Sequence, residues 1–158
     1  SSNRRQRQMC IRDRIIPATL NVTITENLSL ANNSYGNTKQ KTITAQGQAI
    51  QRIMNIPTGG TTLLQLGAVD SSGTIVANNF GYFRFTNMDD TNYVTLQLYI
   101  SATKSGFFRI NPGDSFLLMS PEADFLCEGS EYSLADITRI QAYANTAAVD
   151  CEWLAVTS

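Results

Sequence analysis

Residues 80–100, FGYFRFTNMDDTNYVTLQLYI, decide the fold. From residue 93 to residue 100, apolar side chains occupy every even position, while Tyr, Thr, Gln and Tyr occupy the odd positions. This two-residue period is typical of a strand with one buried face. An aromatic, β-rich run precedes the polar centre NMDDTN. Two such runs around a short polar segment predict a β-hairpin.

Similar runs lie on both sides of this stretch. They predict strands at residues 17–24, 28–30, 41–45, 49–56, 61–69, 74–77, 106–110, 115–119, 139–144 and 149–155.

Turn residues separate these runs and predict further hairpins. DSSG at residues 70–73 indicates an antiparallel return from 61–69 to 74–77. The segment 111–114, Asn-Pro-Gly-Asp, fits a type II turn between 106–110 and 115–119. A small turn near 145–147 joins the last two strands. We expect loops at 31–40 and 121–132, and one helical turn at 133–136.

About ten strands with turn signals between them predict an all-β protein, an antiparallel, jelly-roll-like β-sandwich. The expected core side chains are Leu20, Val22, Ile24, Ile50, Leu64, Leu66, Phe83, Phe85, Val94, Leu96, Leu98, Ile100, Phe108, Phe116, Leu118, Ile140 and Trp153.

The first fourteen residues differ from the rest of the chain. Five arginines against one aspartate give residues 1–14 a charge of +4, while residues 15–158 are acidic. Their sequence MCIRDR, at residues 9–14, resembles a translated sequencing adapter. We therefore expect 1–14 to be a non-native or disordered segment and 15–158 to be a single β-sandwich domain.

The composition removes most catalytic designs. There is no histidine, which excludes Ser-His-Asp catalysis and His-ligated zinc. No glycine-rich phosphate loop follows a strand. Cys10 belongs to the adapter-like segment, and Cys127 and Cys151 are interpreted as two buried free thiols because no secretory signal is evident. We expect no catalytic residue, no cofactor and no metal.

Two candidate sites remain. Asn87, Asp89, Asp90 and Asn92 supply hard oxygen ligands that suit calcium, although the same residues are favoured in turns because they bond the local backbone. The aromatic residues Tyr82, Tyr93, Tyr99, Tyr143 and Trp153 suit a sugar-binding platform, with cross-strand packing as the commoner role. A scattered acid pair for glycoside hydrolysis is a third alternative. Isolated basic residues disfavour nucleic-acid binding.

Three segments carry a family resemblance: FRFTNMDDTNYVTLQL (83–98), FFRINPGDSFLLM (107–119) and LADITRIQAYANTAAVDCEWLAV (134–156). They resemble small β-rich structural proteins of tailed phages, marine phages in particular, and PATLNVTITENLSL (17–30) looks like the usual N-terminal strand pair of that group. The likeness spans residues 17–158.

The resemblance implies a non-enzymatic virion component, such as a capsid decoration protein, a head fibre or a tail-associated subunit. Its partners would be other virion proteins and copies of itself, for example in a trimer, with neither nucleic acid nor membrane as a partner. The alternative is a receptor- or carbohydrate-binding module of a phage fibre, using the surface aromatic residues and the loops at 31–40 and 121–132.

Overall fold

The computed structural model describes residues 18–45, 49–66, 74–75, 80–119, 124–127, 130–133 and 137–157. In these residues all regular structure is β, which confirms the all-β class. Fifteen strands are present, more than the ten expected, because several are only two to four residues long. Residues 1–17, which include the adapter-like segment, lie outside the described part. The contacts within the chain divide it into two units, 1–46 and 47–158.

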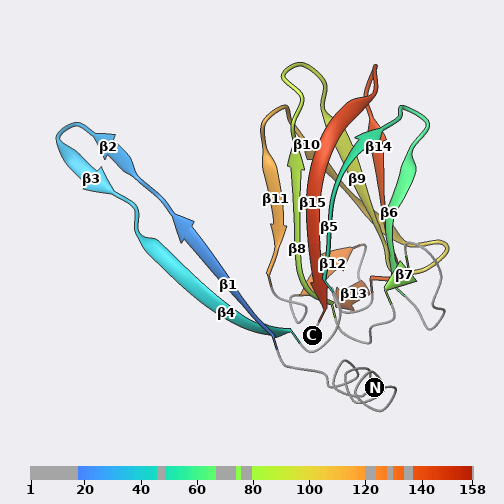
Figure 1. Cartoon of the computed structure of the whole chain (residues 1–158), viewed down its shortest axis with the longest axis horizontal. Coiled ribbons are helices and arrows are strands. Elements are labelled where there is room, and N and C mark those ends of the chain that lie inside the picture. The colour runs from blue at the N-terminus through green and yellow to red at the C-terminus, as the bar shows by residue number, and fades with distance from the viewer. Residues whose placement is uncertain are drawn as a thin grey trace, which may run out of the picture. The chain divides into compact units, whose positions relative to one another are not determined.

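The N-terminal unit is a two-stranded ribbon, which we call the arm (residues 18–45; Figure 1). Strands β1 (Ala18–Thr25) and β4 (Thr38–Ala45) pair antiparallel over their whole length. The ribbon continues into a short hairpin of β2 (Leu28–Leu30) and β3 (Asn33–Tyr35). Residues 33–35 and 38–40 are therefore strand, and the prediction of a loop over 31–40 was wrong. Only Ala31 and Asn32 turn the chain, both with positive φ, as a tight two-residue hairpin requires.

The C-terminal unit is a sandwich of two sheets (Figure 1). One sheet has the order β10-β9-β14-β6-β7 and the other has the order β11-β8-β15-β5. Their strands are β5 (Ala49–Ile56), β6 (Thr61–Leu66), β7 (Thr74–Ile75), β8 (Phe80–Asn87), β9 (Val94–Tyr99), β10 (Ser105–Ile110), β11 (Ser115–Leu118), β14 (Arg139–Ala144) and β15 (Val149–Thr157). The pair β12 (Asp124–Cys127) and β13 (Ser130–Ser133) forms a separate small hairpin where a loop was expected.

Strand pairing in the sandwich is nested. β5 pairs with β15, β6 with β14, β8 with β11 and β9 with β10, all antiparallel. The pairs β8–β15 and β9–β14 then complete the two four-stranded cores. The first strand of the sandwich thus pairs with the last, and the innermost pair is consecutive.

This pairing overturns most of the predicted hairpins. β8 and β9, which flank the NMDDTN segment, belong to opposite sheets and do not pair. The same is true of β10 and β11, and of β14 and β15. β6 and β7 do pair, but in parallel. The cause is that alternation shows only which side chains face the core. The next strand alternates in the same way whether it pairs within the same sheet or crosses to the facing sheet.

The predicted type II turn is confirmed even though its strands separate. The Asp114 amide donates to the Asn111 carbonyl at 3.0 Å, and Gly113 has φ +76° at the third position. The turn therefore carries the chain from one sheet to the other. The turn is joined to the end of β8, because the backbone N–H of Asn87 donates to the backbone carbonyl of Asp114 at 3.0 Å.

The core lies between the two sheets of the sandwich. Eight predicted core residues are buried there: Leu64, Phe83, Phe85, Val94, Leu96, Leu98, Ile140 and Trp153. Ile50, Leu66, Phe116 and Leu118 pack against them while partly exposed. The predictions for Leu20, Val22 and Ile24 were wrong, because they lie on one side of the arm and are only half-buried. Phe108 is 43% exposed at the margin, where its ring packs against that of Phe116 with the centroids 4.9 Å apart and the planes tilted by 40°.

Candidate functional site

The NMDDTN segment uses its oxygen atoms within the protein. Asp89 Oδ2 accepts the backbone N–H of Asn92 at 2.6 Å and that of Thr91 at 3.3 Å. Asp90 Oδ1 accepts the Thr91 hydroxyl at 2.8 Å, and Asn92 Oδ1 accepts the Thr146 hydroxyl at 2.6 Å. Backbone hydrogen bonds, that of Asn92 first, lower the pKa of Asp89. The geometry is that of a turn bonded to its own backbone. Among the described residues, no three Asp, Glu, Cys or His side chains group as a metal site.

Asn87 is the centre of this turn and is fully buried. Its Nδ2 donates to the carbonyl oxygens of Asn92 and Ile110 at 2.9 and 3.1 Å, and its Oδ1 accepts the Asp89 amide at 3.0 Å. One amide thereby fixes the connection between β8 and β9 and the end of β10. The residue that suggested a calcium ligand connects the two sheets.

The predicted aromatic platform divides into two groups. Tyr82 and Trp153 are buried, with 4% and 1% of their surface exposed, and they cannot stack on a ligand. Tyr93, Tyr99 and Tyr143 are half-buried. The structure places Tyr99 and Tyr143 together, on the side of β9 and β14 that faces away from the core.

We call this outward side the Tyr–Arg face. By strand register it comprises Thr95, Gln97 and Tyr99 of β9, Ser105, Phe107 and Arg109 of β10, Arg139, Gln141 and Tyr143 of β14, and Thr62 and Gln65 of β6. None of these residues is acidic. The guanidinium of Arg139 lies 4.0 Å from the centre of the Tyr99 ring, and that of Arg109 lies 3.8 Å from the ring of Tyr93, just before β9. Both distances are those of cation–π contacts.

A hydrogen-bond network crosses this face and fixes Tyr99. The Tyr99 hydroxyl donates to Gln97 Oε1 at 2.7 Å and lies 3.0 Å from Gln141 Oε1. Gln97 Nε2 donates to the Ser105 hydroxyl at 2.9 Å, and Gln141 Nε2 donates to the Thr62 hydroxyl at 3.1 Å. The chain of bonds runs over β10, β9, β14 and β6. The Tyr99 ring is therefore held in one orientation.

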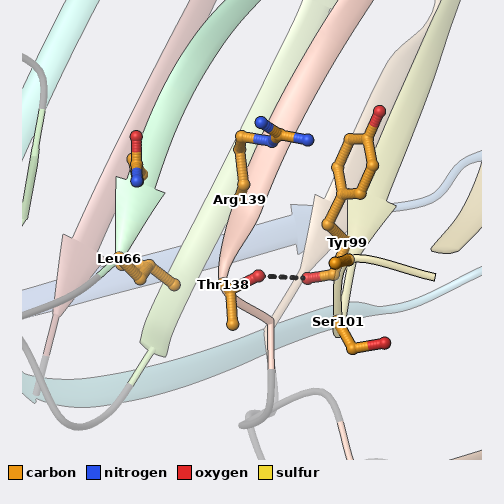
Figure 2. A pocket seen from close by; sticks show the side chains of 7 residues that line it. Leu66, Tyr99, Ser101, Thr138 and Arg139 are labelled. Atoms are coloured by element: carbon orange, nitrogen blue, oxygen red, sulfur yellow. Dashed lines mark hydrogen bonds between the residues drawn. The ribbon is translucent and has the colours of Figure 1, made fainter. Parts of the chain in front are cut away.

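A pocket of about 210 Å³ opens at the Arg139 end of the face (Figure 2). The backbone oxygen of Tyr99 accepts the Thr138 hydroxyl at 3.2 Å, which links the start of β14 to the end of β9. The pocket is lined by Gln65, Leu66, Tyr99, Ser101, Ala102, Thr138 and Arg139.

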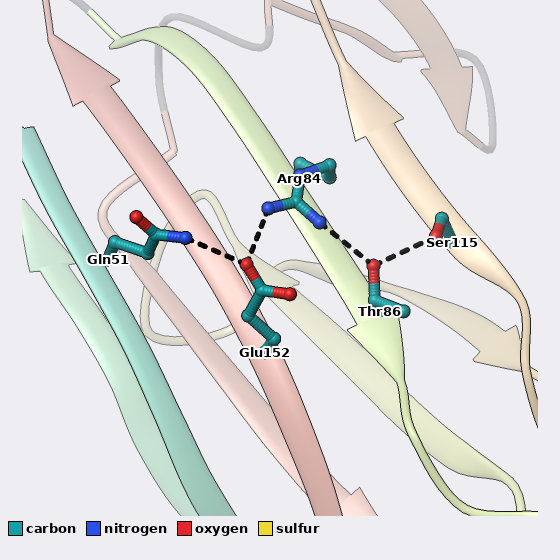
Figure 3. Close-up of polar contacts among 5 residues, drawn as sticks. All are labelled: Gln51, Arg84, Thr86, Ser115 and Glu152. Atoms are coloured by element: carbon teal, nitrogen blue, oxygen red, sulfur yellow. Dashed lines mark hydrogen bonds and ion pairs between the residues drawn. The ribbon is translucent and has the colours of Figure 1, made fainter.

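The outward side of the other sheet carries a different network (Figure 3). Arg84 Nη2 and Gln51 Nε2 both bond Glu152 Oε1 at 2.8 Å, and the pair with Arg84 is an ion pair. Arg84 Nη1 continues to the Thr86 hydroxyl at 3.2 Å, which lies 2.8 Å from the Ser115 hydroxyl. Arg84 first, then Gln51, lowers the pKa of Glu152. Here the arginine is neutralised, whereas on the Tyr–Arg face the arginines lie on tyrosine rings.

Cys151 is a buried free thiol, as expected. Burial raises its pKa to about 12, so it stays protonated near neutral pH. It has no exposed surface and a suppressed thiolate, which makes it a packing residue. The side chains of Cys10 and Cys127 lie outside the described part.

Sequence reasoning selected Tyr99 and Tyr143 but missed the arginines beside them. Arg109 and Arg139 were interpreted as isolated because no sequence spacing shows that β14 and β10 both flank β9. Phe107 was also missed: it belongs to the same face and is 63% exposed. The available signal was positional, since Phe107 and Arg109 are two residues apart and so lie on one side of a strand.

Comparison with protein-family models, with curated proteins and with solved structures gives no match. Within the described residues, no helix has the length and apolar character needed to cross a membrane.

Proposed function

We propose that this protein is a non-enzymatic structural component of a phage virion that assembles by self-association. The arm is the observation that carries the proposal. In the arm Leu20, Val22 and Ile24 share one side of β1, and Ile43 of β4 lies opposite Leu20 on the same side. The opposite side carries threonine, asparagine and glutamine throughout. On the side of Leu20, Lys41 and Lys39 lie opposite Val22 and Ile24, so the arm has apolar residues on one side but no closed hydrophobic core of its own.

The end of the arm is also apolar. Leu28, Leu30 and Tyr35 are 54%, 60% and 51% exposed. A two-stranded ribbon is marginally stable alone in water, and contiguous exposed apolar surface marks an interaction site. An equivalent surface on a second copy would cover these side chains and stabilise both arms. Closed cyclic symmetry, as in a trimer, is the arrangement we propose.

The strand order supports the virion class by analogy. We interpret the nested pairs β5–β15, β6–β14, β8–β11 and β9–β10 as those of a jelly roll, an architecture common in viral capsid and lectin domains. Fold alone does not specify function, so the arm carries the greater part of the proposal. Capsid decoration, head fibre and tail-associated subunit are the positions that we propose for it, with other virion proteins as partners.

The first experiment measures the oligomeric mass of the full chain by light scattering after gel filtration. We expect an oligomer for the native chain and a monomer for Leu28→Asp/Leu30→Asp. Ser29→Asp adds one charge to the opposite side of β2 and is the control, with the oligomer retained. A monomeric native chain that does not co-purify with assembled capsids would overturn the proposal. A second test examines the neighbouring genes, among which we expect genes for capsid, portal or tail proteins.

The second candidate is a receptor- or carbohydrate-binding module, favoured by the Tyr–Arg face. Tyr99 is fixed by its hydrogen bonds, Phe107 is exposed, and amide and hydroxyl groups lie between them. Ordered aromatic rings with polar groups nearby are the usual elements of a small-ligand site. Glycan-array binding by the full chain, without association with capsids, would favour this candidate over the first.

A further inference from the structure

Arg139 lines the pocket, and no carboxylate of the described residues neutralises it. It is half-buried, stacked on Tyr99 at 4.0 Å, and it forms no ion pair with any residue of the described part of the chain. The contrast is Arg84, which bonds Glu152 at 2.8 Å on the other sheet. A guanidinium that lies on a ring keeps its N–H donors available at its edge. Those donors match the two oxygens of a carboxylate.

The support of this guanidinium is preorganised. The Tyr99 ring beneath it is held by Gln97, and Gln141 lies within hydrogen-bond distance from the next strand. These groups lie on paired strands, where positions are more precise than on loops. A ligand that binds Arg139 therefore loses little free energy to ordering the site.

The pocket is the size of one sugar residue. Its volume of about 210 Å³ is below the roughly 300–1,000 Å³ of pockets for drug-sized ligands. Gln65, Ser101 and Thr138 offer amide and hydroxyl groups to ligand hydroxyls, and Leu66 offers an apolar surface to a C–H face. This mixture suits a polyol better than an extended apolar chain.

The charge distribution selects a ligand with a single negative group. Residues 47–158 contain five Lys and Arg against eleven Asp and Glu, a net charge of -6. The charged residues of the Tyr–Arg face, in contrast, are all arginines. Nucleic-acid binding depends on many contacts between basic residues and phosphates. The net negative charge of the domain would therefore repel a nucleic acid. A single carboxylate needs only the local guanidinium. We infer that this pocket binds a carboxylate-bearing sugar residue, with the carboxylate on Arg139; this inference specifies the ligand of the second candidate function and rests on it.

The test titrates the full chain with methyl glucuronide and methyl sialoside, and with methyl glucoside as the neutral counterpart, by calorimetry at constant ionic strength. At least one acidic glycoside is expected to bind, and the glucoside at least tenfold more weakly. Arg139→Gln is expected to weaken the acidic ligand roughly 10- to 100-fold, the usual worth of charge-assisted hydrogen bonds. Arg139→Lys keeps the charge but loses the planar pair of N–H donors, and its affinity is expected to lie between those of the native chain and Arg139→Gln.

Arg52→Gln is the matched control, because it removes the same charge from an exposed position on the other sheet. Its affinity is expected to equal that of the native chain. Equal binding of neutral and acidic glycosides would overturn the carboxylate assignment while the carbohydrate-binding candidate survives. Equal losses in Arg52→Gln and Arg139→Gln, or tighter binding of oligothymidylate, would overturn the site. Binding of no glycoside would overturn both the inference and the second candidate; the self-association proposal is decided separately by oligomeric mass.

Discussion

Replacement of Asn87 by alanine tests whether the NMDDTN segment joins the sheets. The side chain is fully buried and makes three hydrogen bonds, two as donor through Nδ2 and one as acceptor through Oδ1. Alanine removes all three. The Ile110 carbonyl, whose bond to Nδ2 is buried, loses that partner, whereas the carbonyl of Asn92 lies where water can reach it more easily.

An unsatisfied buried polar group costs about 1–3 kcal/mol, and the space left by the amide adds to it. We therefore expect Asn87→Ala to lower the free energy of unfolding by about 2–4 kcal/mol. Asn87→Asp keeps the shape but places a carboxylate oxygen against two carbonyl oxygens. The pKa of this new carboxyl is expected to be raised, so the variant should lose stability as the pH rises above about 4, the unfolded value for Asp.

Urea unfolding followed by tryptophan fluorescence measures the effect, because the chain has a single tryptophan, Trp153, and it is 1% exposed in the sandwich. Asn111→Ala is the control: its side chain is exposed and accepts one bond, from Arg109. We expect that control to change stability by less than about 0.5 kcal/mol. If Asn87→Ala lost no more than the control, the assignment of Asn87 as the link between the sheets would be refuted.

Glu152→Gln should lower the free energy of unfolding by about 0.2–1 kcal/mol near pH 7. Because Arg84 lowers the pKa of Glu152, the ion pair stabilises the fold above the unfolded-state pKa of about 4.3. This stabilisation is lost as the pH falls through the lower pKa of the folded state. An unchanged difference in urea unfolding near pH 2 would contradict it. Cys151 should resist iodoacetamide in the native state and react only in unfolding urea, as mass spectrometry of its peptide would show; fast native labelling is the contrary result. Gly60→Ala should destabilise by about 1–3 kcal/mol in urea titrations, since φ is +86° and a Cβ would overlap a neighbouring tyrosine ring. Gly59→Ala, which meets open space, should be near neutral, and equal losses would refute the argument.

The strands of the sandwich could be predicted because their alternation records burial. Leu96, Leu98 and Ile140 were placed in the core from that period alone, and the structure agrees. Pairing could not be predicted in the same way. A connection such as 88–93 permits either a return or a crossing, and the residue that decides, Asn87, looks like any turn asparagine until its burial is known.

The arm was misassigned for a related reason. Leu20, Val22 and Ile24 alternate as regularly as core residues, so the period alone cannot distinguish a ribbon from a core strand. The informative signal was in the partner strand. Lys39 and Lys41 lie opposite Ile24 and Val22 on the same side, where a closed core would not place two lysines.

Part of the candidate site was also predictable. The two outward tyrosines of β9 and β14 follow from alternation. Arg109 comes from β10, which follows β9 in the chain and pairs with it, but Arg139 comes 40 residues after Tyr99. That β14 becomes a neighbour of β9 is a property of the sheet order, which the sequence does not show. Tyr82 and Trp153 failed as platform residues because an aromatic ring in a strand is most often used for packing.

The nested pairing also determines when the protein can fold during synthesis. Ala49 at the start of β5 pairs with Val156 near the end of β15, so the sandwich cannot close until residue 156 has left the ribosome. Such distant pairing slows folding to the millisecond-to-second range typical of all-β domains. Both strands of the arm lie within residues 18–45, so they emerge earlier, and a second arm would stabilise a ribbon that is marginally stable alone. Under the self-association that we propose, arms on neighbouring nascent chains would meet before either sandwich is complete, and assembly would begin during translation.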